Sequence, residues 1–359
     1  MTRPANPVSQ SPPRASKAPI TTPVSLPRWA RPLLLVAGGL AVAAVFLPQL
    51  RSRPRSPEAS AAMPPSPAPI DGTRAFRYLQ QICDLGPRIA GSESNTRQRE
   101  MVAAHFREHG ATVTEQPFSA PHPLTGKPVA LANLIGSWHP QRNRRVVIAA
   151  HYDTRPFPDE ERDPARRRLP FLGANDGASG VALLMEIAHH LNDLETPWGV
   201  DLVLFDAEEL VYGRHPETRG EYFLGSKEFA RRYLEAVEER GSPQRYVAGV
   251  VLDMVGGKNL RINQEPHSLN LAPDLVREIW SIARRIGARS FRDRIGREVL
   301  DDHLPLNNVG IPTIDLIDFD YPYWHKVDDI PANCAPESLQ EVGRVVTAWL
   351  AMPRSQRIR

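Results

Sequence analysis

The sequence has only two cysteines among its 359 residues, Cys83 and Cys334, and it has no internal repeat. Two cysteines exclude a small disulfide-rich scaffold and a thiolate metal site of the zinc-finger type. Aromatic residues make up only 7% of the chain, but the hydrophobic fraction of 41% is sufficient for a sizeable core. The length allows one large domain or two ordinary ones.

Acidic residues are almost absent from residues 1–70, where Glu58 is the single acid beside eight Lys and Arg. The rest of the chain contains 36 basic and 40 acidic residues, so the positive charge belongs to the N-terminal segment. This segment also holds 15 of the 36 prolines, which is typical of an extended tail. The acidic balance of the larger part argues against nucleic acid as a partner.

Residues 32–50 carry no charge. As an α-helix this run would be about 28 Å long, close to the thickness of the hydrocarbon layer of a bilayer. Five basic and no acidic residues precede it, which favours a cytoplasmic N-terminus and a translocated globular domain. The alternative is a cleaved signal peptide, with Ala59-Ser60-Ala61 as the cleavage sequence. Both alternatives predict a location outside the cytoplasm, in the periplasm or at the cell surface.

The composition therefore predicts five segments along the chain. They are a basic, Pro-rich cytoplasmic tail (1–31), a transmembrane signal-anchor helix (32–50), a Pro-rich linker (51–70), a globular domain (71–352) and a short C-terminal tail (353–359).

Beyond residue 71, short apolar runs alternate with longer amphipathic ones. The runs predict strands at Thr112–Phe118, Ala130–Ile135, Val146–Ala150, Leu202–Phe205, Val247–Leu252 and Thr313–Ile317. They predict helices at Asp71–Leu85, Asn95–His109, Ala178–Leu191, Ser226–Glu239, Pro273–Ile286 and Pro336–Leu350. This alternation predicts a three-layer α/β/α sandwich with a mixed, centrally parallel sheet. The polar segments 155–168 and 211–224 are expected to be solvated loops.

Several predicted strands are followed by residues that can bind a metal or transfer a proton. Open α/β sheets bind their ligands at this place, beyond the carboxyl ends of the strands. These residues are His151 and Asp153, the run Asp206–Glu209, Asp253 and His325, with Asp176 just before a helix at the same edge. Taken singly, His151 could be a core histidine, Asp176 a helix N-cap and Glu208-Glu209 a solvated turn. Together they favour a zinc site, because zinc prefers imidazole and carboxylate ligands. One of the adjacent glutamates can bind the metal while the other transfers a proton, and Asp153 could orient the His151 ring.

Eight separated motifs carry a family resemblance. They are Gly86-Pro87-Arg88, His151-Tyr152-Asp153, Gly173–Gly180, Phe205–Glu209, Leu252-Asp253, Asp301-Asp302-His303, Trp324-His325 and Asp328-Asp329. In this order they resemble the zinc-dependent aminopeptidase family, and within it the glutaminyl-peptide cyclotransferases, or glutaminyl cyclases. The resemblance covers most of residues 72–352 and implies a zinc exopeptidase-like fold.

The resemblance also implies roles for individual residues. Asp176, Glu209 and His325 match the zinc ligands of the cyclases. Glu208 matches the general acid/base, and Asp301 an aspartate that hydrogen-bonds near it. His151 and Asp253 match the additional ligands of two-metal aminopeptidases, in which Asp176 would bridge the ions. Trp324, Asp302 and His303 are expected in the substrate pocket.

Two features favour a cyclase over a peptidase. Fifteen residues separate Glu209 from Gly225-Ser226, a longer insertion than in the aminopeptidases, and Trp324 directly precedes His325. A core position is the alternative for Trp324. The chain departs from the cyclase pattern at Lys326, where threonine is usual, at Leu300 before the aspartate pair, and in the lack of a tryptophan within 211–224.

The resemblance therefore implies an enzyme with one zinc ion that converts the N-terminal glutamine of peptides or proteins to pyroglutamate and releases ammonia. An aminopeptidase with two metal ions is the alternative. A metal-free, receptor-like ectodomain is a third hypothesis, against which the full set of metal ligands argues. In an oxidising compartment we also expect Cys83 and Cys334, near helix ends at the two termini of the domain, to form a disulfide.

Overall fold

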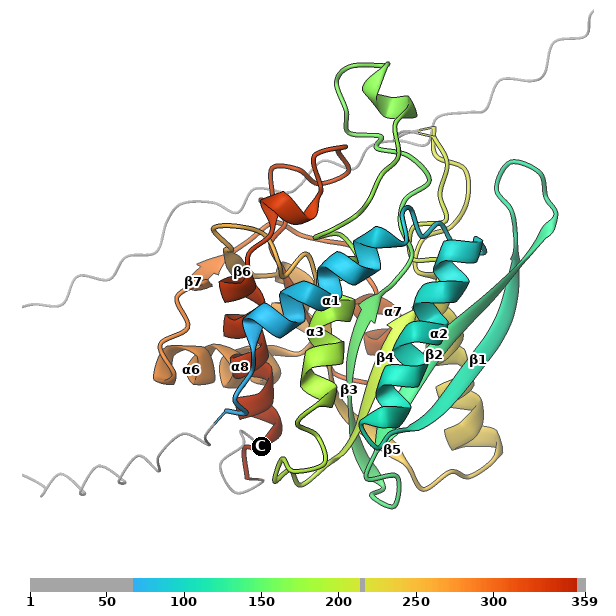
Figure 1. Ribbon diagram of the computed structural model, residues 1–359. Coiled ribbons are helices and arrows are strands. Elements are labelled where there is room, and N and C mark those ends of the chain that lie inside the picture. The colour runs from blue at the N-terminus through green and yellow to red at the C-terminus, as the bar shows by residue number, and fades with distance from the viewer. Residues whose placement is uncertain (1–66, 214–216, 354–359) are drawn as a thin grey trace, which may run out of the picture. The chain divides into compact units, whose positions relative to one another are not determined.

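The computed structural model of the protein describes residues 67–353, apart from 214–216 (Figure 1). The predicted tail (1–31), membrane anchor (32–50) and nearly all of the linker lie outside these residues. Within the part that is described, no helix is both long enough and apolar enough to cross a membrane.

A six-stranded mixed sheet forms the centre of the fold. In spatial order its strands are β1 (Thr112–Pro121), β2 (Pro128–Trp138), β4 (Gly199–Phe205), β3 (Arg144–His151), β5 (Arg245–Asp253) and β8 (Thr313–Ile317). Strands β4, β3, β5 and β8 are parallel, whereas β2 pairs antiparallel with β4, and β1 antiparallel with β2. The predicted α/β fold with a mixed, centrally parallel sheet is therefore confirmed.

Both faces of the sheet are buried, as the side chains of β3 illustrate. Val146, Ile148 and Ala150 belong to the larger hydrophobic cluster, whereas Val147 and Ala149 belong to a second cluster on the opposite face. This separation follows from the two-residue period of a strand, which points successive side chains to opposite faces. A strand that is covered on both faces has a continuous apolar sequence, which is the pattern of 146–150 in β3 and 202–205 in β4.

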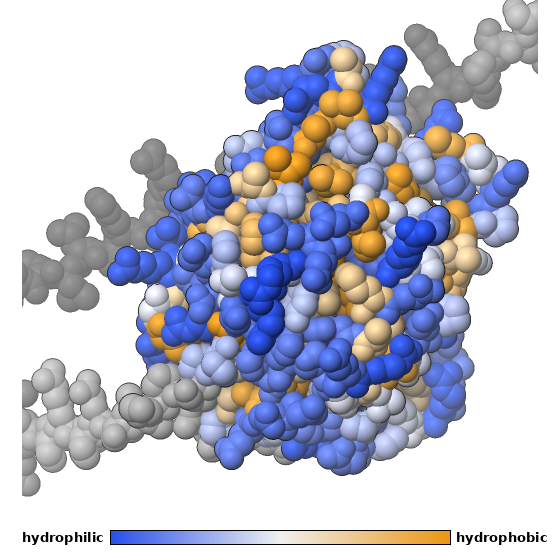
Figure 2. All heavy atoms as spheres, viewed as in Figure 1, coloured by the Kyte–Doolittle hydropathy of each residue, from blue (hydrophilic) through white to orange (hydrophobic). Residues whose placement is uncertain are grey.

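Helices supply the two outer layers. The larger cluster includes side chains of α1 (Gly72–Asp84), α2 (Glu93–Glu108), α3 (Ala178–Ala188), α6 (Pro273–Arg285) and α8 (Pro336–Leu350). The second cluster includes side chains of α4 (Leu224–Leu234) and α7 (His303–Asn308). Figure 1 shows α1 and α3 side by side in front of the sheet. The face in Figure 2 is mainly hydrophilic, with hydrophobic residues gathered toward the upper end of the view.

Several short elements are missing from the sequence-based prediction. They are β6 (Ile262–Gln264) and β7 (Phe291–Ile295), which form a separate two-stranded parallel sheet, α5 (Pro266–Leu271), α7, and the 3-10 turns Arg166–Arg168 and Pro331–Asn333. Elements of this length are too short to show a periodic pattern. The helix predicted over Ser226–Glu239 is α-helical only to Leu234 and ends in a π-helical segment, Glu235–Glu239.

The domain begins before the predicted boundary at residue 71. Ala68 and Ile70 are buried in the larger cluster, and the Ile70 side chain occupies the space that a Cβ on Gly343 of α8 would need. Asp71 then caps α1, because its side chain accepts a hydrogen bond from the backbone N–H of Arg74 at 2.9 Å. The last residues of the predicted linker are therefore part of the folded domain.

The predicted disulfide is not formed, since Cys83 and Cys334 are both buried free thiols. Burial raises the pKa of Cys83 to about 12 and that of Cys334 well above its ordinary value. The reactive form in disulfide formation is the thiolate, which neither side chain readily becomes in these surroundings.

Candidate metal centre and active site

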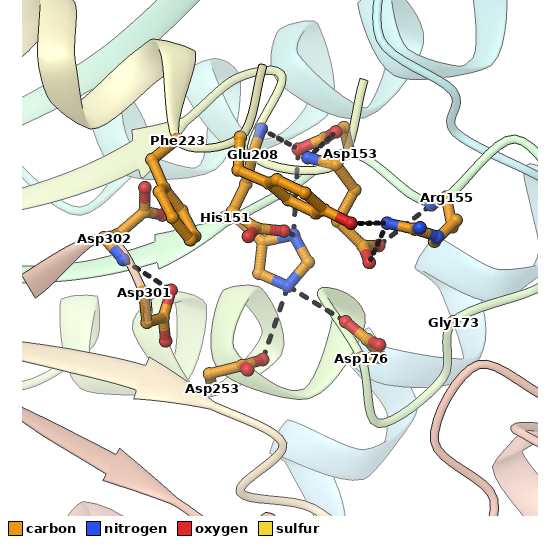
Figure 3. Close-up of polar contacts among 12 residues, drawn as sticks. His151, Asp153, Arg155, Gly173, Asp176, Glu208, Phe223, Asp253, Asp301 and Asp302 are labelled. Atoms are coloured by element: carbon orange, nitrogen blue, oxygen red, sulfur yellow. Dashed lines mark hydrogen bonds and ion pairs between the residues drawn. The ribbon is translucent and has the colours of Figure 1, made fainter. Parts of the chain in front are cut away.

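The strand ends bring the predicted site residues to one edge of the sheet. His151 is the last residue of β3 and Asp253 the last of β5, while Asp206–Glu209 directly follow β4. These three neighbouring strands are parallel, so their carboxyl ends lie together. Figure 3 shows Asp176, from the turn before α3, and Asp253 both facing the same nitrogen of the His151 ring.

Two histidines share the carboxylate of Asp176. His151 Nε2 lies 3.1 Å from Asp176 Oδ1 and 3.3 Å from Asp253 Oδ1. His325 Nε2 lies 3.6 Å from Asp176 Oδ2 and 2.7 Å from Glu209 Oε1. The structure thus gathers all five residues that the motifs match to metal ligands, with Asp176 between the two histidines.

Asp176 is not the N-cap of α3. The N-cap residue is Gly177, and no side chain caps this helix end. Gly177 has a φ of 89°, and a Cβ at this position would lie 2.8 Å from the carbonyl oxygen of Asp153. Glycine therefore permits the close turn that this segment makes. The backbone N–H of Asp176 donates to Asp329 Oδ2 at 3.1 Å, and the Asp176 carboxylate faces the two histidines.

The donor atoms in this cluster fit a zinc ion. Asp176 Oδ2 and Asp253 Oδ1 are buried oxygens without a hydrogen-bond partner among the described residues. Such atoms are costly in a folded protein unless a cation or a donor compensates them. Donor atoms of His151, Asp176 and Glu209 all lie within 4.8 Å of one another, and His325 contacts the last two. Imidazole and carboxylate donors of this kind are ordinary zinc ligands.

Asp153 was predicted to orient the His151 ring. In the structure its carboxylate instead binds the backbone of the turn that carries Glu208 and Glu209. Its Oδ1 accepts the N–H of Glu208 and its Oδ2 the N–H of Glu209, both at 3.0 Å. The distance from Asp153 Oδ1 to His151 Nδ1 is 3.7 Å, which is longer than a hydrogen bond. Ala207, just before the glutamates, has a φ of 56°, which is uncommon for a residue with a Cβ. Asp153 therefore stabilises a strained turn that directs both glutamates to the site.

Burial and mutual repulsion raise the pKa values of Glu208, Asp253 and Asp301. Burial and the adjacent Glu209 raise the pKa of Glu208 well above its ordinary value. Burial and the charge of Asp253 raise the pKa of Asp301 to about 6. A carboxyl group whose pKa is raised toward neutrality can both accept and return a proton, which suits Glu208 to general acid/base catalysis.

A cavity of about 270 Å³ opens beside these carboxylates. Its polar side includes Asp176, Glu208, Glu209 and Asp301, and its apolar wall includes Tyr222, Phe223, Val299, Leu300, Phe319 and Trp324. Trp324 stacks on His325 with a ring-centroid distance of 4.1 Å and an interplanar angle of 27°. Trp324 is therefore a wall of the cavity, and it is partly buried against a small hydrophobic cluster that includes Val299 and Tyr321.

Asp302 and His303 do not line this cavity, although the motif predicts them in the pocket. Both are fully buried; Asp302 Oδ1 accepts a hydrogen bond from Ser226 Oγ at 2.5 Å, and His303 Nε2 lies 3.4 Å from Glu265 Oε2. The chain enters α7 at His303 and turns into the protein, so that of this run only Asp301 reaches the cavity.

Arg155 and Asp159 belong to the site, although their segment was expected to be a solvated loop. Only 1% of Arg155 and 4% of Asp159 is exposed. Asp159 Oδ1 lies 2.8 Å from His325 Nδ1, and Arg155 donates to Asp159 Oδ2 at 2.7 Å. The backbone N–H of Arg155 also donates to Glu209 Oε2 at 2.9 Å. A carboxylate behind a metal-binding histidine fixes the orientation of its ring, which is the position of Asp159.

Arg88, from the Gly-Pro-Arg motif, supports the turn that carries Asp176. The guanidinium is fully buried, and it donates to the carbonyl oxygens of Leu172 at 2.6 Å and Gly173 at 2.9 Å. A buried cation that is satisfied by backbone carbonyls fixes the course of the chain just before the site.

Comparison with known proteins is consistent with this geometry. The profile of peptidase family M28 matches residues 133–350. The chain therefore belongs to peptidase family M28, a zinc-dependent family.

Within this family, the similar proteins include glutaminyl cyclases. Fimbriiglobus ruber glutaminyl cyclase is 41% identical in sequence to this chain. Its crystal structure matches the present one with a TM-score of 0.77, over 80% of this chain and 96% of that one. Bacteroides thetaiotaomicron glutaminyl cyclase is 32% identical, with a TM-score of 0.71 and coverage of 79% and 99%. The glutaminyl-peptide cyclotransferase-like protein of Bos taurus is 26% identical over 291 residues, which are 74% of this chain and 71% of that protein. The predicted resemblance to the cyclase branch is confirmed.

Proposed function

We propose that the protein is a zinc-dependent glutaminyl-peptide cyclotransferase, which converts the N-terminal glutamine of peptides or proteins to pyroglutamate. The observation that supports this function most directly is the position of Glu208. Its carboxylate lines the same small cavity as Asp301 and lies 3.9 Å from His151 Nδ1, and its pKa is raised by burial and by Glu209. The similarity to glutaminyl cyclases supports the same reaction.

In this reaction the α-amine of the substrate attacks the carbon of its own side-chain amide. A new C–N bond closes the five-membered ring, and the original amide C–N bond breaks to release ammonia. Glu208 takes the proton from the attacking amine and returns it to the leaving nitrogen. Zinc held by Asp176, Glu209 and His325 would polarise the amide carbonyl. The cavity keeps the glutamine side chain folded toward its own amine, which makes the attack effectively unimolecular.

The cavity wall suits a single small residue with an exposed amine. Trp324 and Phe319 provide flat apolar surfaces, and Tyr222 stands in the segment that lacks a tryptophan. Lys326, another departure from the cyclase pattern, donates to the carbonyl oxygen of Pro322 at 2.5 Å and is not part of the wall. These departures therefore leave an aromatic pocket beside Glu208.

One zinc ion is sufficient for the proposed reaction, because the nucleophile is already part of the substrate. An aminopeptidase must instead activate a water molecule, for which a second ion at His151 and Asp253 would serve. His151 and Asp253 lie in positions that such an ion would require, so peptidase activity is the second candidate function.

The products distinguish the two reactions. With a Gln-Ala-type peptide, the zinc-loaded protein should release ammonia and leave a peptide that is lighter by the mass of one ammonia molecule. With a Leu-Ala-type peptide it should release no free leucine. Mass spectrometry and an ammonia assay measure both products. Free N-terminal amino acids without ammonia would instead establish an aminopeptidase.

The proposal includes attachment to a membrane through residues 32–50, with the catalytic domain outside the cytoplasm. The uncharged run and the basic residues before it support this location. After fractionation, the full-length chain should sediment with membranes and be released only by detergent, whereas the chain from residue 67 onward should stay soluble. An intact, uncleaved full-length chain in the cytosol would contradict membrane attachment, and a shortened secreted chain would favour a cleaved signal.

A further inference from the structure

Three histidines meet at the edge of the domain that lies away from the candidate active site. His105 is in the last turn of α2, His109 is the residue directly after this helix, and His189 directly follows α3. Because α3 starts beside Asp176, its far end is about 16 Å from the active site. One donor nitrogen from each of the three histidines lies within 4.8 Å of the other two. The ring centroids of His109 and His189 are 3.9 Å apart, and those of His105 and His109 are 4.3 Å apart.

Hydrogen bonds determine which nitrogen of each ring is available. His105 Nε2 donates to the carbonyl oxygen of Met185 at 2.8 Å, and His109 Nδ1 donates to the carbonyl oxygen of His105 at 2.8 Å. Since a carbonyl can only accept, the lone pairs are on His105 Nδ1 and His109 Nε2. His189 Nε2 lies 2.7 Å from the Tyr78 hydroxyl, which leaves Nδ1 for a further interaction. Metal-binding histidines typically use their second ring nitrogen in this way, as a donor to an oxygen.

We propose that His105, His109 and His189 bind a zinc ion, distinct from the metal of the candidate active site. The end of α2 brings the rings of His105 and His109 together, and His189 completes a set of three imidazoles. Three imidazoles and one water molecule form a known tetrahedral zinc environment. Such a site requires nitrogen atoms roughly 3.4 Å apart, and one nitrogen of each ring already lies within 4.8 Å of the other two.

The surroundings keep the imidazoles neutral, as metal-binding histidines must be. Burial lowers the pKa of His105, and burial together with His109 lowers the pKa of His189 to about 4. Rings without a second proton present their lone pairs at neutral pH. The nearby cation, Arg74, is paired with Glu186 at 2.6 Å. A metal here would join the C-terminal ends of α2 and α3, and Tyr78 would link it to α1.

The test measures zinc binding and thermal stability in a His325→Ala background, which weakens the candidate active-site metal. In this background we expect one zinc ion by equilibrium dialysis, and a Tm that rises on addition of zinc chloride. Adding His109→Gln or His189→Gln should weaken this binding by at least about tenfold and abolish the rise in Tm. His190→Gln is the matched control, because His190 is adjacent but pairs with Glu186 at 3.1 Å. It should bind zinc like the parent.

Equal zinc binding by the parent and by both glutamine variants would overturn this proposal, as would a parent whose Tm does not respond to zinc. Unfolding in the presence of a chelator checks the fold, since the parent and the variants should then have the same Tm. In the otherwise unaltered enzyme, His109→Gln should leave the cyclisation rate unchanged. A failure of the histidine site is thus distinguishable from a failure of the proposed reaction.

Discussion

Replacing Glu208 with Gln is expected to lower kcat for Gln-initiated peptides by about 10²- to 10⁴-fold, the usual effect of losing a general acid/base. Gln has the same shape as Glu but cannot accept the proton from the attacking amine. Zinc content should not change, because the zinc ligand is the adjacent Glu209. Rate measurements under saturating substrate and metal analysis of the same preparation give both quantities.

The pH profile provides a second measure of the same residue. The raised pKa of Glu208 means that its carboxyl group gains a proton as the pH falls through a range above that of an ordinary glutamate. A protonated Glu208 cannot act as a base, so kcat/KM of the wild-type enzyme should decrease as the pH falls through this pKa. The residual activity of Glu208→Gln should lack this decrease.

Glu221→Gln is the matched control for this substitution. Glu221 also lies between β4 and α4, but its side chain is 74% exposed and it is not part of the cavity lining. Its substitution should leave the rate within about threefold of the wild type, as for a surface residue. If Glu208→Gln lost less than about tenfold in kcat, a proton-transfer role for Glu208 would be excluded.

Replacing His325 with Ala is expected to have a comparably large effect, in this case through the metal. His325 Nε2 faces both Glu209 and Asp176, so the variant loses the only imidazole of the proposed ligand set. After dialysis, bound zinc should fall by one equivalent relative to the wild type, and cyclisation should fall with it. Unchanged zinc content and unchanged turnover would remove His325 from the site.

Asp159→Asn separates the loss of the ligand from the loss of its orientation. Asp159 contacts the other ring nitrogen of His325, and its loss should weaken zinc binding by about 10- to 100-fold. High concentrations of zinc should restore the activity of Asp159→Asn but not that of His325→Ala. If zinc did not restore Asp159→Asn, the orienting role assigned to this carboxylate would be wrong.

The periodicity of the sequence was sufficient to predict the sheet and the edge at which the site lies. In β3 the apolar run 146–150 is followed by His151, and in β5 the apolar run 247–252 is followed by Asp253. Apolar runs of this kind must be buried on both faces, which places them inside a parallel sheet. Parallel strands end at a common edge, so residues that follow them in sequence come together in space.

Other features depend on contacts that no local pattern records. Segment 155–168 is rich in charge, and its buried pair meets partners far along the chain: Asp159 contacts His325, and Arg155 donates to Glu209. The sequence does not distinguish a charge that is paired in the interior from one that is solvated. The inward turn of Asp302 and His303 likewise follows from the position of α7 against the rest of the domain.

The sequence by itself therefore determined the fold class, the strand ends and the residue types of the candidate metal centre, because these follow from local periodicity and from ligand chemistry. The tertiary structure alone decided how the free thiols are buried and which carboxylate orients His325. It also brought His105 of α2, and His109 just after it, beside His189 after α3. The physical reason is that hydrophobic periodicity fixes which face of an element is buried. The partner that each buried polar group meets is fixed only when separate elements pack together.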